Sequence, residues 1–410
     1  MTSNENIIDT TTRAVPAGIP AATRLALEML EGLQGGALAI ELPDGQSLRV
    51  GHGALVAHWR VRDHAVFESA LARGDIGLAE AWMDGLWDTD HLAALLGLLA
   101  SNRAVLGRAV YGRALRLMAA RLWHLLLANT RAGSRRNIEA HYDLGNDFYA
   151  LWLDETMTYS AAVFESADGA EEGALAEAQR RKYRRILDRL NVRPGQTILE
   201  IGCGWGGFAE VAATEYGCHV HGLTLSPSQL AFARTRAFEG GFDDRARFEL
   251  CDYRDATGEF DHIVSIEMIE AVGERFWPVY FGRIHELLKP GGRCVIQAIT
   301  IDDTLFARYR RGTDFIQRYI FPGGMLPSPT AVARQAARAG LHACGDFAFG
   351  RDYARTLAQW HERFDACESQ VRAQGFPERF LRMWRFYLAY CEAGFTTGDI
   401  DVHHYEFVRT

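Results

Sequence analysis

Apolar residues recur along the first hundred residues with two different spacings, which predict a small mixed domain. Short alternating runs predict three strands, at 37–42, 46–50 and 54–61. Apolar residues at helical spacing predict three helices, at 25–33, 66–73 and 76–83. Thr23 is in place to cap the first of these helices. We therefore expect residues 21–100 to form an α+β domain, after a polar, disordered N-terminus over residues 1–20.

From residue 197 onward, apolar strands alternate with helices. The predicted strands lie at 197–201, 218–223, 246–250, 262–266, 293–299, 343–349 and 402–408. The predicted helices lie at 227–238, 274–288, 329–339, 352–374 and 376–394. Such alternation predicts an α/β fold with a parallel, doubly wound sheet. Residues 302–326 interrupt the alternation with aromatic residues, arginines and Pro322-Gly-Gly, and we expect them to form a lid over a substrate.

A basic, apolar segment separates the two parts. Residues 91–138 contain no Asp or Glu and carry eight arginines, namely Arg103, Arg108, Arg113, Arg116, Arg121, Arg131, Arg135 and Arg136. One interpretation is a helical linker over 101–138 that contacts anionic lipid headgroups while its apolar side chains reach the acyl boundary. The other is an ordinary docking helix with a solvated arginine face. The pattern leaves both open.

Composition limits the possible binding partners of the protein and its possible cellular compartment. The chain has 410 residues, enough for two or three domains, and a net charge of −8, which gives no indication of nucleic-acid binding. Its seven cysteines form no C-x-x-C pair, as expected for reduced thiols in a cytoplasm. No His, Cys and Asp cluster has metal-ligand spacing, so we expect no metal. No apolar run approaches a membrane span, so any contact with lipid would be peripheral.

A glycine-rich turn follows the strand at 197–201 and precedes a helix that begins near Phe208. Its glycines are Gly202, Gly204, Gly206 and Gly207. A strand, a glycine turn and a helix bring backbone N–H groups close to a bound nucleotide. The G-x-G-x-G spacing differs from that of a dinucleotide site, and no Lys-Ser/Thr follows, which excludes a P-loop. The turn therefore predicts a site for S-adenosyl-L-methionine.

Eight motifs in a fixed order extend the interpretation to the whole chain. They are Tyr-Asp-x-Gly-Asn-Asp at 142–147, Thr-Tyr-Ser at 158–160, Gly-Cys-Gly-Trp-Gly-Gly at 202–207, Leu-Thr-Leu-Ser-x-x-Gln at 223–229, Asp-Tyr-Arg-Asp at 252–255, Glu-x-Val-Gly at 270–273, Tyr-Ile-Phe-Pro-Gly-Gly at 319–324 and Arg-Met-x-x-Phe-Tyr-Leu at 382–388. With these motifs the chain resembles the cyclopropane-fatty-acyl-phospholipid synthase family, also described as mycolic acid cyclopropane synthase-like. These enzymes use S-adenosylmethionine to methylate the double bond of an acyl chain.

The resemblance implies a fold, a substrate and a location. The fold is a Rossmann-like class I methyltransferase domain over 139–410, with a mostly parallel seven-stranded sheet whose last strand is antiparallel. The N-terminal domain would engage lipid at the inner face of the membrane. The substrate would be membrane phospholipid with unsaturated acyl chains, and the product a cyclopropane acyl chain. A homodimer would let two N-terminal domains share one membrane patch.

The same resemblance assigns residues to the cofactor. Those expected to contact it are Tyr159, Ser160, Gly202, Gly204, Gly206, Thr224, Gln229, Asp252 and Tyr253. Asp252 follows a predicted strand, where carboxyl ends form the binding crevice, and is placed for the adenine edge. Its alternative is a turn acid that caps Tyr253 and Arg254.

Glu270 matches the family's active-site glutamate, which helps to hold a bicarbonate thought to accept a proton. Its family partners are a cysteine, a histidine, an isoleucine backbone group and a tyrosine. This chain keeps Ile299 and, as the matching tyrosine, Tyr387. It carries Ala161 in place of the cysteine and Gln297 in place of the histidine. Since a glutamine cannot carry charge or shuttle a proton, bicarbonate binding is in doubt.

Two hypotheses follow for the proton step. Glu270 could act as the base itself or through water, with a pKa raised by burial. The changed base position could also alter which proton leaves, giving a methyl-branched or methylene chain in place of a ring. Glu267 is interpreted as a structural acid. Aromatic faces that could stabilise a cation are those of Tyr319, Phe321, Trp384, Phe386 and Tyr387.

Two further classes of function are weighed against a lipid methyltransferase. A methyltransferase for a soluble small molecule would not need the basic apolar segment or the N-terminal domain. A non-catalytic lipid-binding protein would not need the complete glycine turn, Glu270 and Tyr387. The sequence therefore favours an enzyme that acts on lipid.

Overall fold

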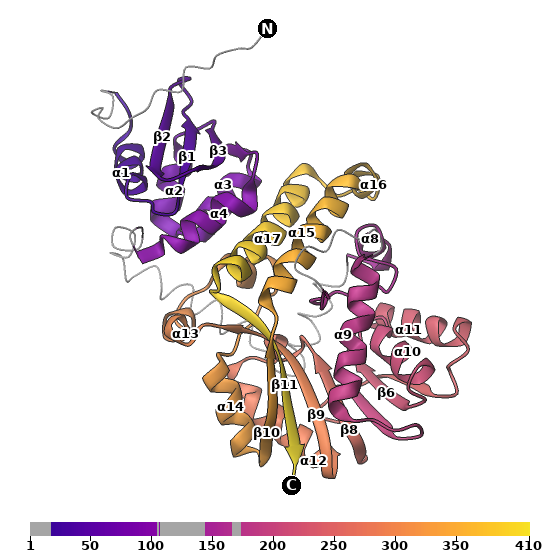
Figure 1. The fold of residues 1–410 in the computed structure, drawn as a ribbon. Coiled ribbons are helices and arrows are strands. Elements are labelled where there is room, and N and C mark those ends of the chain that lie inside the picture. Colours follow the sequence, from indigo (N-terminus) through magenta and orange to yellow (C-terminus); the bar gives the residue numbers. More distant parts are fainter. Residues whose placement is uncertain (1–17, 105, 107–143, 166–173) are drawn as a thin grey trace. The chain divides into compact units, whose positions relative to one another are not determined.

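The computed structural model describes residues 18–104, 106, 144–165 and 174–410. The chain divides into two compact units (Figure 1). The first unit comprises Met1–Ala119 and Arg372–Thr397, and the second comprises Ala120–Val371 and Gly398–Thr410. The expected domain boundary placed all of 139–410 in one domain, whereas the structure groups Arg372–Thr397 with the N-terminal part. Most of the basic segment 101–138 lies outside the described residues.

The first unit contains a four-stranded sheet in the order β2-β1-β3-β4. Its strands are β1 (Gly36–Glu41), β2 (Ser47–His52), β3 (Leu55–Val61) and β4 (Trp87–Thr89). Its helices are α1 (Ala21–Leu30), α2 (Ala65–Arg73), α3 (Asp75–Met83), α4 (Leu92–Ser101) and α17 (Glu378–Thr397). Strand β1 pairs antiparallel with β2 and parallel with β3. The expected α+β composition of this part is present, with the additional strand β4.

The expected cap of the first helix is wrong. Helix α1 begins directly after Pro20 and has no side-chain cap, so Thr23 lies inside its first turn. Thr23 is buried, and its Oγ1 lies 3.0 Å from Nδ1 of His64. The hydroxyl group therefore takes a partner from a distant part of the fold in place of a backbone N–H of its own helix.

Aromatic packing explains why α17 belongs with the first unit. The Trp87 ring lies 5.5 Å from that of Trp59 and 4.9 Å from that of Trp82. From α17, the guanidinium of Arg382 lies 4.1 Å from the Trp82 ring centroid and donates to the Trp87 carbonyl at 2.8 Å. It also pairs with Asp88 at 2.9 Å. A cation on an aromatic face and charge-assisted hydrogen bonds thus attach a late helix to an early strand.

The second unit is built on a seven-stranded sheet in the order β10-β11-β9-β8-β5-β6-β7. Its strands are β5 (Thr197–Ile201), β6 (His219–Thr224), β7 (Ala246–Leu250), β8 (Phe260–Ile266), β9 (Leu288–Ile301), β10 (Leu341–Ala348) and β11 (Ile400–Arg409). The pairs β5–β6, β5–β8, β6–β7 and β8–β9 are parallel. Only β11 runs antiparallel, between β9 and β10. This is the mostly parallel sheet with an antiparallel last strand that the resemblance implied.

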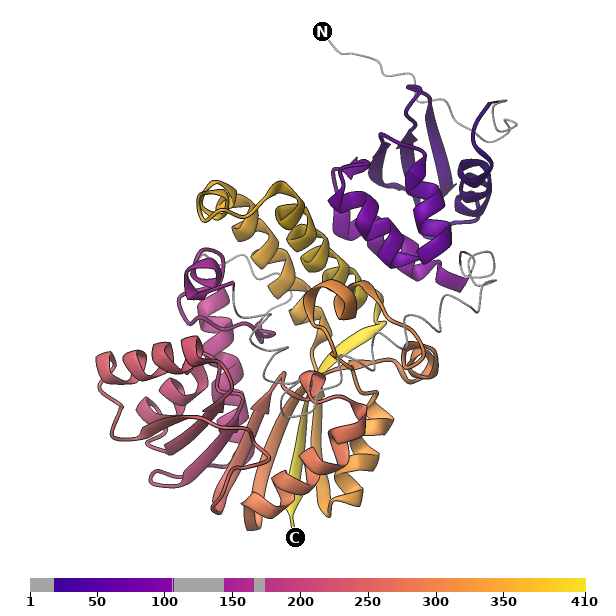
Figure 2. The same cartoon turned by 180° about the vertical axis from the view of Figure 1, so that it is seen from behind.

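Helices cover both faces of this sheet (Figures 1 and 2). Side chains alternate between two cores: Ile198 of β5 packs with α9 (Ala174–Leu190), α10 (Gly207–Thr214) and α11 (Pro227–Glu239). Leu199 faces the opposite core, with α12 (Trp277–Leu287) and α14 (Pro329–Arg338). Burial on both faces explains why these strands are nearly continuous apolar runs.

The second unit contains further helical segments, the last of which, α16, crosses the boundary between the two units at residue 372. They are α8 (Asn146–Ala150), the 3₁₀ turns Ile269–Ala271 and Glu274–Phe276, α13 (Asp303–Tyr309), a π-helical turn at Ile316–Ile320, α15 (Gly350–Ala366) and α16 (Glu368–Ala373). In the part of the chain that the structure describes, no helix combines the length and apolar character needed to cross a membrane.

Candidate active site

The glycine turn adopts backbone conformations that favour glycine. The φ angles of Gly202, Gly204 and Gly206 are 87°, 51° and 85°. A Cβ atom on Gly206 would lie 3.2 Å from Cβ of Ala233 and 3.3 Å from Cζ of Phe248. The turn is therefore both left-handed and closely packed, and β5 passes directly into α10, which begins at Gly207. This geometry places backbone N–H groups at a helix N-terminus, where an anionic group can bind.

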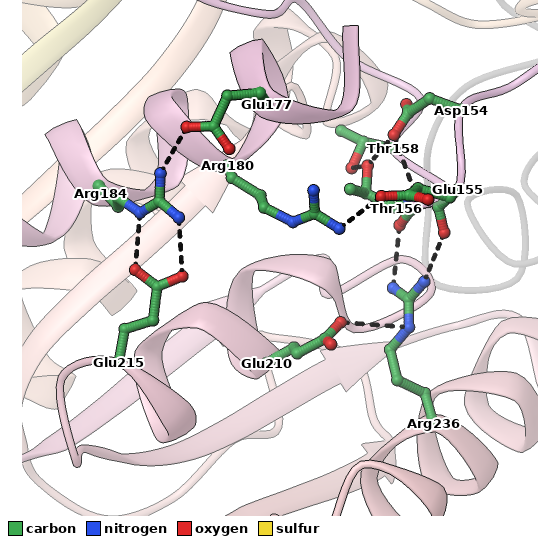
Figure 3. A network of polar contacts seen from close by, with 10 residues as sticks. All are labelled: Asp154, Glu155, Thr156, Thr158, Glu177, Arg180, Arg184, Glu210, Glu215 and Arg236. Atoms are coloured by element: carbon green, nitrogen blue, oxygen red, sulfur yellow. Dashed lines mark hydrogen bonds and ion pairs between the residues drawn. The ribbon is translucent and has the colours of Figure 1, made fainter. Parts of the chain in front are cut away.

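Arg236 of α11 joins the glycine turn to the loop that carries Tyr159 and Ser160 (Figure 3). Its Nη1 donates to the carbonyl of Thr156 at 2.9 Å and to that of Trp205 at 3.1 Å. Its Nε lies 3.5 Å from a carboxylate oxygen of Glu210 on α10. One guanidinium thus holds three segments together.

Arginines of α9 make further ion pairs around this loop (Figure 3). Arg180 pairs with Glu155 at 2.7 Å, while Arg184 pairs with Glu177 at 2.7 Å and with Glu215 at 2.6 Å. Several of these side chains are more than one-third exposed, and exposed pairs contribute little stability individually. Arg180–Glu155 links α9 to the loop and Arg184–Glu215 links α9 to the end of α10, whereas Arg184–Glu177 lies within α9.

Ser160 is held from inside the protein by α9. Its Oγ accepts a hydrogen bond from Nζ of Lys182 at 2.5 Å, and its carbonyl accepts one from Nε2 of Gln179 at 2.8 Å. Lys182 is completely buried. Burial lowers the pKa of its ammonium group to about 7, although the carboxylates of Glu267, Asp154 and Glu200 oppose the shift. This lysine was not singled out from the sequence.

Tyr159 lies in an aromatic cluster. Its ring centroid lies 5.4 Å from that of Tyr149, 5.6 Å from that of Trp152 and 5.3 Å from that of Trp360. Such tilted and edge-on contacts hold the ring in one orientation. The loop therefore presents Tyr159 from a rigid apolar base.

Thr224 and Gln229 lie where the sequence placed them, at the end of β6 and in the first turn of α11. Thr224 Oγ1 donates to Oε1 of Gln229 at 3.0 Å, and Ser226 caps the helix by accepting from the Gln229 N–H. The bond to Thr224 fixes the orientation of the Gln229 amide. Both side chains are buried.

Asp252 follows β7, and its carboxylate pairs with Arg254. The two side chains meet through Nε at 2.8 Å and Nη2 at 2.5 Å, and the Arg254 N–H also donates to Asp252. This is the turn-capping arrangement named above as the alternative, so an adenine contact of Asp252 stays a prediction. Neighbouring Tyr253 packs edge-on against Tyr280 at 5.6 Å, and burial raises the pKa of its hydroxyl to about 12.

Glu270 lies in the 3₁₀ turn after β8, with its carboxylate close to β9. Its Oε1 accepts a hydrogen bond from the Ile299 N–H at 2.5 Å. Its Oε2 is buried and has no hydrogen-bond partner among the described residues. Burial, followed by the nearby charge of Glu267, raises the pKa of Glu270 to about 8. The structure thus brings Glu270 and Ile299 together and leaves one carboxylate oxygen available to accept a proton.

Ala161 and Gln297 are also brought together, around Glu267. Oε1 of Glu267 accepts from the Ala161 N–H at 2.8 Å and from Nε2 of Gln297 at 2.7 Å. Oε2 accepts from the hydroxyl of Tyr353 at 2.7 Å. Burial raises the pKa of Glu267, while these three donors and the charge of Lys182 favour its ionised form.

His404 fixes the orientation of the Gln297 amide. The two residues face each other across the β9–β11 ladder, and Nε2 of His404 lies 2.9 Å from Oε1 of Gln297. Burial, together with the positive charges of Arg185 and Lys182, holds the pKa of His404 well below its usual range, so the ring is neutral. Its Nε2 proton is donated to the amide oxygen, which turns the amide nitrogen toward Glu267.

Part of the expected lid borders Glu270. The Met325 N–H donates to the Glu270 carbonyl at 2.8 Å. Within the same segment, Nε2 of Gln317 donates to the Tyr309 hydroxyl at 3.1 Å and to the Gly324 carbonyl at 3.0 Å. Gln317 lies in the π-helical turn, a feature often found at functional sites. The segment 302–326 is thus attached to the backbone of the candidate base.

The tyrosine that donates to Glu267 is Tyr353, which sequence reasoning missed. It lies in the first turn of α15, 86 residues after Glu267, and no local pattern marks it. Tyr387 lies on α17 in the first unit, where its ring is 5.2 Å from that of Trp384. A catalytic role for Tyr387 stays a prediction. The position of Glu267 near Glu270 could have been found from the sequence, because the two residues follow the same strand and are three residues apart.

A family model described as mycolic acid cyclopropane synthetase matches residues 129–405. The chain belongs to this cyclopropane synthetase family. It is 42% identical over 350 residues to a tuberculostearic acid methyltransferase of Mycobacterium tuberculosis, covering 83% of this chain and 81% of the relative. It is 35% identical over 363 residues to a cyclopropane-fatty-acyl-phospholipid synthase of Escherichia coli, covering 87% and 89%.

Solved structures agree with this assignment. A crystal structure of a mycolic acid cyclopropane synthase complexed with SAH and CTAB matches with a TM-score of 0.62 and 32% identity, over 67% of this chain and 98% of that chain. This cyclopropane synthetase family member is therefore an S-adenosylmethionine-dependent methyltransferase of the cyclopropane-fatty-acyl synthase type. The resemblance seen in the motifs, the fold and the expected cofactor are confirmed.

The residues present fit S-adenosylmethionine. The left-handed glycine turn, the oriented Gln229 amide and the Tyr159–Ser160 loop, which Arg236 ties to that turn, supply apolar contacts and hydrogen-bond donors. Among the residues that the structure describes, no group of three or more His, Cys, Asp or Glu side chains could hold a metal ion.

Proposed function

We propose that the protein transfers a methyl group from S-adenosylmethionine to the double bond of an unsaturated acyl chain in a phospholipid. The observation that supports this most directly is Glu270, a buried carboxylate with one oxygen anchored on the Ile299 N–H and the other without a partner among the described residues. An alkene that takes up a methyl group becomes a cation and must then lose a proton. A buried base at the carboxyl edge of the sheet is what that step requires.

Each part of the site has a separate task in this proposal. When bound, S-adenosylmethionine supplies an electrophilic methyl group on a cationic sulfur. The glycine turn and the Tyr159–Ser160 loop orient the cofactor, and the lid segment attached to Glu270 excludes water. Oε2 of Glu270 takes the proton, and the electrons of the broken C–H bond form the new carbon–carbon bond. Ring closure uses a proton of the transferred methyl group, whereas a proton from elsewhere on the cation leaves an alkene.

Two products are candidates, each supported by a different observation. A cyclopropane chain is the first, since the matching family model and the Escherichia coli relative carry that activity in their names. A methyl-branched or methylene chain without ring closure is the second. It is favoured by the 42% identity to a tuberculostearic acid methyltransferase and by Ala161 and Gln297 at positions where the family has a cysteine and a histidine.

Proton NMR of recovered lipid tests the reaction and separates these products. The purified protein is incubated with S-adenosylmethionine and oleoyl-phospholipid vesicles, and the lipid is extracted. Upfield ring-methylene signals would identify a cyclopropane, and vinylidene or methyl-branch signals would identify the open product. Unchanged lipid with unconsumed cofactor would reject the proposal and favour a different acyl or small-molecule substrate.

We propose further that the protein works peripherally at the inner, cytoplasmic face of the membrane, with residues 21–100 engaging lipid. The arginines between 103 and 136 support contact with anionic headgroups. Co-sedimentation with anionic and neutral liposomes tests this, since binding should require the anionic lipid and fall with added salt. Equal recovery of the protein with both lipids would contradict this proposal.

We also propose that the protein forms a homodimer. Light scattering would measure the mass of the particle in solution and so test this.

A further inference from the structure

The carboxylate of Glu267 is bound as proteins bind a small anion. Three donors converge on its two oxygens from separate elements: the Ala161 N–H before α9, the Gln297 amide on β9 and the Tyr353 hydroxyl on α15. The distances are 2.8, 2.7 and 2.7 Å, typical of hydrogen bonds to an ionised acceptor. The donors come from three segments that are distant in the sequence, so the whole fold is organised around this carboxylate.

Two of these donors come from the positions at which the chain departs from the family's bicarbonate ligands, Ala161 and Gln297. Here both positions donate to a side chain of the protein itself. Bicarbonate therefore does not fit beside Gln297, because the donors that would hold it are already taken. This difference from the family indicates that the carboxylate of Glu267 fills the position of the anion.

We infer that Glu267 is a built-in anion that takes the place of bicarbonate and positions Glu270 as the proton acceptor, so that methyl transfer proceeds without bicarbonate. This inference rests on the proposed function. Glu270 remains the group that takes the proton, and Glu267 acts through its fixed charge.

The backbone of Glu267 supports a specific role for its side chain. Its φ angle is 49°, in the left-handed region that residues with a side chain adopt rarely. Its N–H donates to the Gln297 carbonyl at 2.8 Å, which holds this conformation at the end of β8. Such local strain persists where the surroundings determine it, and it is often found at functional sites. Here it directs the carboxylate toward its three donors.

The charges around Glu267 allow it to remain ionised. Its three hydrogen-bond donors and the nearby Lys182 of α9, when that lysine is protonated, favour its charge, and Glu270 is the carboxylate that follows it in the chain. Asp154 and Glu200 face the same lysine, and His404 behind Gln297 is neutral. An ionised Glu267 disfavours a second negative charge nearby and so makes Glu270 a stronger proton acceptor.

The test measures bicarbonate dependence with the full-length protein. Methyl transfer to oleoyl-phospholipid vesicles is followed in buffer freed of carbon dioxide, with and without added sodium bicarbonate. The wild-type rate should change less than about twofold. Glu267→Gly removes the carboxylate and suits the left-handed backbone. Without bicarbonate its rate should be about 100-fold below that of wild type, and added bicarbonate should raise the rate of the variant by at least about tenfold. Glu286→Gln, on the exposed side of α12, is the control and should behave as wild type.

A binding measurement gives a second readout that needs no turnover. Carbon-13 NMR of labelled bicarbonate should show no binding to the wild-type protein with S-adenosylhomocysteine present, and should show binding to Glu267→Gly. Wild-type binding, or a wild-type rate that collapses without bicarbonate, would overturn the inference and leave the proposed function standing. Full activity of Glu267→Gly without bicarbonate would overturn it as well.

Glu267→Gln covers the case in which the glycine variant fails to fold. Its amide can keep the donors at Ala161 and Gln297 occupied but carries no charge. We expect a slower enzyme that bicarbonate does not rescue, with the acidic limb of its pH–rate profile displaced to lower pH, because Glu270 loses a negative neighbour. An unchanged profile would count against the inference. If neither the wild-type protein nor any variant methylates acyl chains, the proposed function fails. The bicarbonate-binding measurement would still show whether Glu267 occupies the site that bicarbonate would fill.

Discussion

Nζ of Lys182 donates a hydrogen bond to Oγ of Ser160 at 2.5 Å in a site where both side chains are buried. Lys182 belongs to α9, which precedes the sheet, and Ser160 belongs to the loop expected to contact the cofactor. The bond therefore links the position of this loop to a helix anchored in the core. It also places a buried positive charge near Glu267, whose charge raises the pKa of the candidate base Glu270.

Replacing this lysine should weaken cofactor binding. Because burial lowers the pKa of Lys182 to about 7, its hydrogen bond is charge-assisted at pH 6, where such a bond contributes about 1.5–3 kcal/mol. At that pH Lys182→Met should therefore raise the Kd for S-adenosylhomocysteine by roughly tenfold or more. Isothermal titration calorimetry measures the effect. Lys289→Met removes a partly exposed lysine that pairs with Asp261 at 2.7 Å and serves as the control. Equal affinities for both variants would show that Ser160 needs no support from α9.

Glu270 should control the pH dependence of methyl transfer. A base must be deprotonated to accept a proton, and the pKa of Glu270 is raised to about 8, so the rate should increase as the pH rises through about 8. Glu270→Gln should lose about 10²- to 10⁴-fold of the rate and this pH-dependent limb. Single-turnover rates between pH 6 and 9.5 would show both effects. Full activity of the variant would exclude Glu270 as the base.

The same residue should make the protein less stable as the pH rises. Between the ordinary carboxyl pKa of 4.5 and the folded-state value of about 8, the native protein holds a proton that the unfolded chain has released. The free energy of unfolding therefore falls by up to about 1.4 kcal/mol per pH unit across this window. Glu270→Gln removes that dependence, so its Tm should exceed that of wild type at pH 8 and approach it at pH 5. Calorimetry at the two pH values measures this, and a constant difference would contradict it.

Two glycines of the turn should respond differently to alanine. Gly206 has a φ of 85°, and its added Cβ would press against Ala233 and Phe248. Gly206→Ala should therefore lower stability by more than about 1 kcal/mol and displace the turn, weakening binding of S-adenosylhomocysteine. Gly204→Ala is the matched variant, because nothing lies within 4 Å of its added Cβ. Similar losses of stability and affinity in both variants would mean that the left-handed backbone conformation, and not the close packing around Gly206, determines the effect.

The role of Asp252 can be separated from that of its ion pair. Asp252→Ala and Arg254→Met both break the pair, so both should lower the Tm to a similar extent. If Asp252 also contacts the adenine edge, as predicted, only its own variant should weaken binding of S-adenosylhomocysteine, by about tenfold for one lost charge-assisted hydrogen bond. Titration calorimetry on both variants distinguishes the two cases. Equal affinity in both would leave Asp252 with a capping role alone.

Much of the fold could be predicted from local pattern. Strands β5 and β7 lie where apolar runs placed them, and α11 begins at the expected Pro227 after a capping serine. These elements are buried on defined faces, so the pattern of apolar residues in their sequence directly reflects which side chains are buried. Thr23 shows the limit of such reasoning. Its residue type suits a helix cap, but its hydroxyl is paired with His64, 41 residues away.

The sequence by itself determined the family, the glycine turn for the cofactor and Glu270 after the fourth strand of the parallel sheet. Each depends on residues close together in the chain, where spacing constrains geometry. Only the tertiary structure decided that Ala161, Gln297 and Tyr353 all donate to Glu267, and that α17 packs with the first unit. These contacts join residues between 30 and 300 positions apart. They form only when the sheet and its helices pack, and no local pattern encodes that packing.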